Sequence, residues 1–246
     1  MSLWGKFFCA QHDYSFLNIE SNILVYNLIL PLNSLIPLKK LKSNQRIGPH
    51  NYEVLSILIG SLLGDAYAER HGNGTRICFQ QEELNTSYLI GFHEFLSERG
   101  YCNKTIPKLT SRIGKEGKIR YLSRFKTYTY SSFNWIHENF YQNNRKIIPQ
   151  NISEYLSPIA LAVWIQDDGG RLSSGLKIAT NSFTYEEVKF LGEILRDKYQ
   201  FKVSVHKAGA LNQYNLYFSK NSMNKLVEII KPYMHTSMYY KLNGYI

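Results

Sequence analysis

Two aspartates, Asp65 and Asp168, each end an apolar run that contains small residues. The first run covers residues 58–64 and is followed by Asp-Ala, whereas the second covers residues 161–166 and is followed by Asp-Asp-Gly. The two acids lie in different halves of the chain. A motif that recurs at the spacing of small domains indicates a duplicated half-domain.

The small residues in these runs would let two helices approach closely: Gly60, Gly64, Ala160 and Ala162. If the helices pack in parallel, both acids emerge at the same C-terminal end, where the helix dipole disfavours carboxylates and the two acids repel each other. Either one acid is protonated or a cation lies between them. Oxygen ligands suit Mg²⁺, which beside a phosphodiester can activate water and stabilise the leaving oxygen. The alternative is a pair of ordinary turn residues after core helices, but the second copy favours a functional pair.

The elements that would position the acids follow the same order in both halves. The pattern of apolar residues and turn signals predicts these first-half elements: helix 52–64, strands 67–69 and 75–80, helix 85–100, strands 108–113 and 118–130, and helix 132–140. The second-half elements are helix 158–168, strand 177–180, helix 184–199, strands 202–207 and 213–218, and helix 222–230. Thr184 and Glu187 have the spacing of a capping box.

The predicted fold class is therefore α+β, with two pseudo-symmetric αββαββα half-domains whose antiparallel sheets lie side by side as a saddle. We expect an N-terminal extension over residues 1–45, a first half over 46–150 and a second half over 151–246. An apolar stretch over residues 23–30 is too short to span a bilayer, so no membrane is expected as a partner.

The net charge of +10, from 29 Lys and Arg against 19 Asp and Glu, indicates a polyanionic partner. The three cysteines lie far apart, the seven histidines form no ligand-like cluster, and no phosphate-binding glycine loop or nucleophile elbow is present. Acid–base glycosidase chemistry could also use two carboxylates. It explains neither the charge nor the duplication.

A two-stranded ribbon fits the major groove of DNA, where each base pair presents a distinct pattern of donors and acceptors. The predicted strands and their loops carry suitable side chains, of which most would position the DNA backbone and some would read bases. In the first half these are Arg76, Gln80, Lys108, Arg112, Arg120, Arg124 and Lys126; in the second they are Arg171, Lys177, Asn181, Lys202, His206, Asn212 and Tyr214.

From about residue 43 to the C-terminus, the chain resembles the LAGLIDADG homing endonucleases, in the single-chain form with two motifs and in the intron-encoded organellar branch. The segments that carry the resemblance are residues 59–60, 63–67, 145–149, 156–158, 164, 167–170, 182–188, 231–233 and 238–242. The first motif departs from the family name, because it has Gly64 and Ala66 where the name spells Ala and Gly.

This resemblance implies a monomeric, mitochondrial endonuclease that cuts double-stranded DNA at a long asymmetric site with Mg²⁺, for which Mn²⁺ would substitute. Asp65 and Asp168 would be catalytic and bind the metal, helped by the carbonyls near Gly64 and Asp167, and Lys146 and Lys241 would be the paired active-site lysines.

Arg145 is an alternative to Lys146, and Gln80 and Asn181 are candidates to order water near the acids. Two other functions are compatible with the same family: a maturase that binds its group I intron RNA, and an inactive DNA-binding module. The two intact acids argue against the inactive module.

Overall fold

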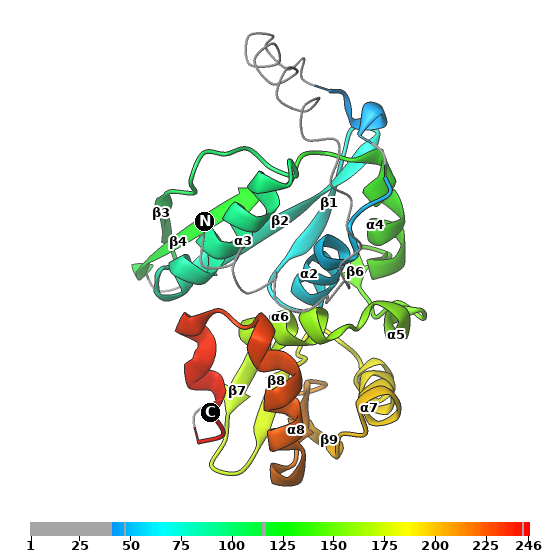
Figure 1. Ribbon diagram of the computed structural model, residues 1–246, viewed down its shortest axis with the longest axis vertical. Helices are drawn as coiled ribbons and strands as arrows, with labels where there is room; N and C mark the ends of the chain where they lie inside the picture. The colour runs from blue at the N-terminus through cyan, green and yellow to red at the C-terminus, as the bar shows by residue number, and fades with distance from the viewer. Residues whose placement is uncertain (1–40, 47, 115–116, 243) are drawn as a thin grey trace, which may run out of the picture.

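The computed structural model describes residues 41–46, 48–114, 117–242 and 244–246, and it confirms the expected α+β fold (Figure 1). The predicted extension over residues 1–45 lies outside the described residues except for 41–45. Within the described part of the chain, no helix combines the length and the apolarity that a bilayer crossing requires.

The first half contains the expected αββαββα order with short additions. Its elements are η3 (Ser43–Gln45), α2 (Tyr52–Leu63), β1 (Tyr67–His71), β2 (Gly74–Glu82), η4 (Glu83–Asn85), α3 (Thr86–Glu98), β3 (Leu109–Ile113), β4 (Ile119–Lys126), η6 (Ser131–Phe133), α4 (Asn134–Phe140), β5 (Tyr141–Gln142) and β6 (Arg145–Lys146). The small hairpin of β5 and β6 was not predicted, because strands of two residues show no alternation of apolar and polar side chains.

The second half repeats this order after the short helix α5 (Ile152–Tyr155). Its elements are α6 (Pro158–Asp168), β7 (Gly169–Arg171), β8 (Leu176–Ala179), α7 (Tyr185–Tyr199), β9 (Val203–Lys207), β10 (Tyr214–Phe218), α8 (Lys220–Ile230), η7 (Lys231–Tyr233) and η8 (Thr236–Leu242). Helix α7 begins with the predicted capping box, in which Thr184 and Glu187 bond each other's backbone N–H. Strand β7, which was not predicted, follows α6 without a loop.

Each half has one antiparallel four-stranded sheet with the same strand pattern, β1-β2-β4-β3 in the first and β7-β8-β10-β9 in the second. Strand alternation sends Ile77, Phe79 and Phe125 toward the helices of the first half, and Ile178 and Leu216 toward those of the second, where all five are buried. The opposite face of each sheet, which we call the open face, carries the intervening residues.

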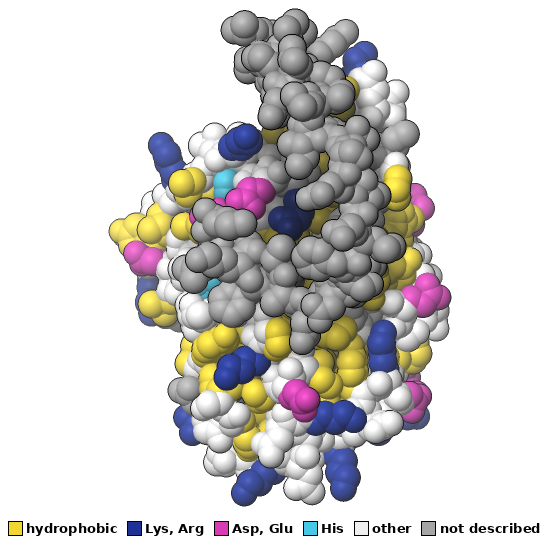
Figure 2. All heavy atoms as spheres, in the orientation of Figure 1, with side chains coloured by type: hydrophobic (Ala, Val, Ile, Leu, Met, Phe, Trp, Pro, Cys, Tyr) yellow, Lys and Arg dark blue, Asp and Glu magenta, His cyan; other side chains and the backbone are white. Residues whose placement is uncertain are grey.

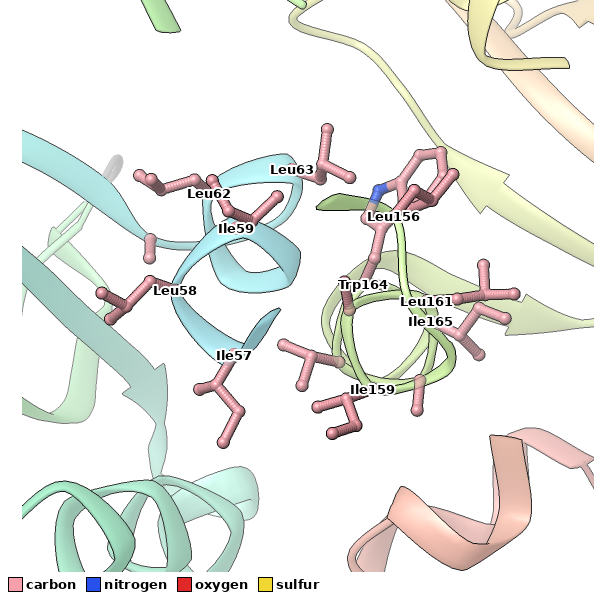
Figure 3. Close-up of a cluster of buried hydrophobic side chains, with 14 of the residues drawn as sticks. Ile57, Leu58, Ile59, Leu62, Leu63, Leu156, Ile159, Leu161, Trp164 and Ile165 are labelled. Carbon is pink, nitrogen blue, oxygen red and sulfur yellow. The ribbon is translucent and has the colours of Figure 1, made fainter. Parts of the chain in front are cut away.

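Helices α2 and α6 lie side by side between the two halves (Figure 1). In Figure 3, Leu58 and Leu62 point from α2 toward the first half, whereas Leu161 and Ile165 point from α6 toward the second. All four side chains belong to one continuous apolar core. The motif helices therefore supply the centre of the core as well as the ends that carry the acids.

Candidate active site

The motif helices make backbone-close contact at two positions. A Cβ atom added to Gly60 would lie 2.5 Å from the carbonyl oxygen of Ala160, and one added to Gly64 would lie 2.5 Å from Cβ of Asp167. Only glycine fits at such distances. Ala162 was expected at this contact, and this was wrong: two residues correspond to about 200° around an α-helix, which turns Ala162 away from the side that Ala160 presents to α2.

The helices run in parallel, so their acids emerge at the same end. Asp168 is the last residue of α6, and Asp65 follows Gly64, which caps α2. The backbone N–H of Asp65 donates to Oδ2 of Asp167 across the boundary between the halves (3.4 Å). Parallel packing places both acids at a common end, as expected.

Asp167 connects the second motif to the first half, a role that the sequence did not reveal. Its Oδ1 accepts hydrogen bonds from the Tyr88 hydroxyl (2.9 Å) and from Nε2 of Gln81 (3.3 Å). Burial, followed by the nearby charges of Asp65 and Asp168, raises the pKa of Asp167, and the Tyr88 hydrogen bond opposes this rise. Because its oxygens already accept three bonds, Asp167 serves to hold the two halves in register.

The amide that meets the acids belongs to Gln81. Its Nε2 donates to Oδ2 of Asp65 (2.8 Å), and its Oε1 accepts from Nδ2 of Asn85 (3.1 Å), which fixes the amide orientation. Gln80, the expected residue, is exposed on the opposite face of β2, and Asn181 is also exposed. The prediction missed by one residue, and neighbours on a strand face opposite sides.

Two buried or half-buried lysines bind the carbonyl groups around the two acids. Lys146 donates to the carbonyls of Gly64 (3.1 Å) and Ala66 (2.9 Å). Lys241 donates to the last carbonyls of α6, those of Ile165 (3.4 Å), Gln166 and Asp167 (3.0 Å). Each lysine therefore neutralises the negative end of its own motif helix or the turn after it.

Burial is the main influence on both ammonium groups. It lowers the pKa of Lys146 to about 8, and it lowers the pKa of Lys241 as well, although the neighbouring aspartates oppose both shifts. Arg145, the alternative to Lys146, turns the other way and forms a two-bonded ion pair with Glu187 of α7 (2.9 and 3.1 Å). The geometry thus brings Lys146, and not Arg145, to the motif.

The two acids have unlike surroundings. Asp65 is exposed, whereas Asp168 is partly buried. Burial, followed by the charge of Asp65, raises the pKa of Asp168 to about 7, and the charges of Lys146 and Lys241 oppose this rise. A carboxyl group with such a pKa gains from any cation that shares the space between the two acids.

The carboxylates of Asp65 and Asp168 suit a hard cation that takes its other ligands from solvent and substrate. Among the described residues, no group of three or more His, Cys, Asp or Glu side chains is arranged to hold a metal without help. Two carboxylates with no nitrogen or sulfur ligand match Mg²⁺, which takes its remaining ligands from water and phosphate. The Gly64 and Asp167 carbonyls, expected as further ligands, each accept a hydrogen bond from a lysine, and their role as metal ligands stays a prediction.

The open face of the first sheet gathers most of the basic side chains expected to meet DNA. Cross-strand partners share a face, and the register aligns Glu69 with Arg76, Cys78 with Lys126, Gln80 with Arg124, and Arg112 with Arg120. Lys108 is exposed one residue before β3. Leu122 occupies the same face and is buried, so the face is not polar throughout.

The second open face is less basic. Lys177 of β8 and His206 of β9 lie on it, and Lys202, Asn181 and Asn212 are exposed just outside the strands or in the loop before β10. Figure 2 shows the other side of this half, where α8 is drawn in front of β8 (Figure 1) and the Lys and Arg side chains are scattered among apolar, uncharged and a few acidic ones.

Two residues expected to meet DNA lie on the helix-covered face of the second sheet instead. Tyr214 packs its ring against Tyr185 of α7. Arg171 pairs with the buried Leu176, although its own side chain is exposed at the sheet edge. The sequence does not define the strand registers, and with them the inward and outward positions; the DNA contacts of both residues stay predictions.

Fold and site together define a two-motif LAGLIDADG protein. The sequence profile of the LAGLIDADG DNA endonuclease family matches residues 55–226, and the chain belongs to this family. The solved structure of the homing endonuclease I-WcaI bound to its DNA recognition sequence is similar, with a TM-score of 0.70, 25% sequence identity, and coverage of 78% of this chain and 86% of that one.

Curated relatives carry two kinds of name. The cytochrome b mRNA maturase bI2 of Debaryomyces hansenii is 50% identical over 200 residues, covering 80% of this chain and 76% of that protein. The protein of the same name from Saccharomyces cerevisiae is 45% identical over 212 residues, covering 82% of this chain but only 50% of that protein. The intron-encoded endonuclease ai4 of Dictyostelium discoideum is 43% identical over 154 residues, covering 61% of this chain and 97% of that protein.

Proposed function

We propose that this chain is a site-specific, metal-dependent endonuclease that cuts both strands of DNA at a long asymmetric site and so promotes the mobility of the intron that encodes it. The observation that carries the proposal is the convergence of Asp65 and Asp168 at one end of the packed motif helices, at the centre of a molecule with two open sheet faces. The names of the relatives support an intron-encoded protein, which we assign to the mitochondrion.

Asp65 and Asp168 would hold Mg²⁺, or Mn²⁺ in its place. A bound divalent metal lowers the pKa of a water molecule and offsets charge on the scissile phosphate. Gln81 orients the Asp65 carboxylate, and the ammonium groups of Lys146 and Lys241 add positive charge beside the phosphate. Both acids belong to one chain, so a monomer supplies the whole site. We assign residues 46–150 and 151–246 to the two halves that bind the two sides of the target.

The competing function is an RNA maturase for a group I intron, and the observation that favours it is the maturase name of two relatives at 50% and 45% identity. The two activities need different groups. Hydrolysis of a phosphodiester requires the acids, whereas assistance to RNA folding requires only a binding surface. An inactive DNA-binding module would not require the acids either.

The test is cleavage of a randomised duplex library by the purified protein with Mg²⁺, with sequencing of the cut ends. We expect one long asymmetric site. Asp65→Asn and Asp168→Asn should each lower double-strand cleavage by about a thousandfold or more, since the metal contributes several kcal/mol to the barrier, while DNA binding changes by less than about threefold.

Asp197→Asn, an exposed aspartate of α7, is the matched control and should cut normally. If the wild-type protein cuts no duplex but accelerates splicing of its host intron, the maturase is the function and the endonuclease proposal is wrong. Sequence-specific duplex binding with neither activity would identify the inactive module.

A further inference from the structure

Glu69 places a carboxylate on the open face of the first sheet, where most charged side chains are basic. It lies on β1 directly opposite Arg76 of β2. One residue before it, Ala68 is buried under the helices, so Glu69 points to the open side. A carboxylate here repels the phosphates of any DNA that lies on this face. Its presence therefore calls for a role other than general attraction of DNA.

Glu69 holds two of the basic side chains that we expect to meet DNA. Its Oε2 accepts from Nε of Arg76 (2.8 Å) and Nζ of Lys126 (3.0 Å), and Sγ of Cys78 lies 3.4 Å away. The hydrogen bonds from Arg76 and Lys126 lower the pKa of Glu69 to about 2, so it is ionised at any physiological pH.

The side chains of this cluster are less exposed than those of Arg120 and Glu82, which form another ion pair on the first sheet. The side chains of Arg76 and Glu69 are 23% and 37% exposed, whereas those of Arg120 and Glu82, whose atoms lie 3.0 Å apart, are 59% and 64% exposed. Exposed pairs impose little order on their partners. Glu69 instead fixes the guanidinium of Arg76 against the sheet.

The hydrogen bond from Arg76 to Glu69 uses Nε, so the edge of the guanidinium formed by the two terminal Nη groups is not used by this bond. Two N–H groups of an arginine can donate to O6 and N7 of guanine in the major groove. This contact requires the guanidinium plane to be correctly oriented. An arginine that is oriented before binding also loses less side-chain entropy when it makes that contact.

We infer that Glu69 is a specificity-determining positioning residue, which orients Arg76 to read one guanine in the major groove of the target. The inference rests on the DNA binding proposed above. Glu69 is the fourth residue after Asp65, so at most about 13 Å of extended chain joins the two. Allowing for the length of Arg76, the guanine lies within about six base pairs of the cleavage centre, at roughly 3.4 Å per pair.

Counted from the motif acids, the second-half position that corresponds to Glu69 is Leu172, which lies one residue beyond the end of β7 and is not a carboxylate. The basic residue next to β7 is Lys177, which lies opposite Gly170, and a Cβ on that glycine would be 3.3 Å from Cε of Lys177. A lysine is a flexible point charge without a fixed fork. The inferred guanine preference therefore belongs to one side of the target only.

The experiment measures the binding preference at every position of the target by selection from a duplex library without metal, so that it does not depend on cleavage. The variants are Glu69→Gln, Arg76→Lys, the double variant, and Glu82→Gln as the matched control on the exposed pair. We expect the wild-type protein and Glu82→Gln to prefer guanine about tenfold at one inner position.

Glu69→Gln and Arg76→Lys should each reduce that preference to about threefold or less, leave the other positions unchanged, and give no further loss when combined, as expected for residues that act as one unit. A wild-type preference profile that persists in Glu69→Gln overturns this inference, and so does a loss spread evenly over all positions. Specific binding without cleavage overturns only the proposed endonuclease, whereas binding without any base preference overturns both.

Discussion

The two halves share one topology, but the exposure and the hydrogen bonds of their acids and lysines differ. In the first half, Asp65 is exposed and receives an amide hydrogen bond from Gln81, and Lys146 comes from a small hairpin to bind two carbonyls. In the second half, Asp168 is partly buried, and Lys241 is only 6% exposed and binds three carbonyls. The same pairing of an acid with a buried ammonium group is thus found beside an exposed acid in one half and beside a partly buried acid in the other.

The open faces differ more than the motif helices do. The first carries Glu69 opposite Arg76, with several further basic side chains on the neighbouring strands. On the second, Lys177 lies opposite a glycine. Close helix packing tolerates little change because a single methyl group at Gly60 would collide with backbone. A solvent-facing strand position tolerates much more. Duplicated halves can therefore diverge in recognition while the centre stays symmetric.

The largest expected difference between the halves concerns the two lysines. Lys241→Met should lower the free energy of unfolding by about 3 kcal/mol, since it leaves three carbonyls at a helix end without their donor, and Lys146→Met by about 2 kcal/mol, since it leaves two. Methionine keeps the apolar stem in both cases. Denaturant unfolding of both variants measures the difference.

Cleavage assays on the same proteins extend this comparison. Both variants should cut DNA more slowly while binding it normally, because each ammonium group contributes charge beside the phosphate. Equal losses of stability would show that the number of carbonyls each lysine binds does not set its contribution.

A second, smaller effect concerns pH in the metal-free protein. Asp168 has an ordinary pKa of 3.8 and a folded-state pKa of about 7, so the folded state binds its proton more tightly, and stability falls as pH rises between these values. Asp168→Asn removes this fall in stability, because the amide does not ionise. Its melting temperature in EDTA should match that of the wild type near pH 4 and exceed it by about 3 °C or more at pH 8.

Adding Mg²⁺ at pH 8 should close this gap by stabilising the wild-type protein, since the metal binds the folded state only. Asp197→Asn should follow the wild type at every pH. A gap that stays constant with pH would mean that Asp168 does not titrate in this range.

The smallest effect tests the ion pair that links the halves at the surface. Arg145→Ala removes the pair with Glu187, in which the arginine side chain is 49% exposed, and should lower the free energy of unfolding by about 0.5–1 kcal/mol. Cleavage should stay within about twofold of wild type, since Arg145 faces away from the motif. A loss of cleavage as large as that of Lys146→Met would reassign the active-site role to Arg145.

Most of the fold could be predicted because its signals are local. Apolar periodicity located the long helices, and Thr184 with Glu187 marked the start of α7. The strands of the sheets were found where turn residues bounded them. Strand β7 escaped because Gly169 and Gly170 carry no strand propensity, and its pairing with β8 is a tertiary contact.

The site was predictable only as far as the motifs reach. The acids and the lysines lie in recognisable segments, but Asp167 and Gln81 act through contacts between halves, which no local pattern encodes. That Gln81 meets the acids in place of the expected Gln80, and that Lys146 reaches the motif in place of Arg145, depends on which side of a strand each residue faces. That side follows from register, which the sequence defines weakly in short strands.

The α2–α6 contact also gives the molecule a mechanical property. The helices meet at the boundary of the halves, and Asp167 joins the two motifs beside the acids, so the contact acts as a pivot. If the halves rock about it, strands β3 and β9, at the sheet edges opposite β1 and β7, travel furthest and the acids least. Under the proposed function, straight and bent DNA would then both be bound at their ends with little change in the spacing of the two carboxylates.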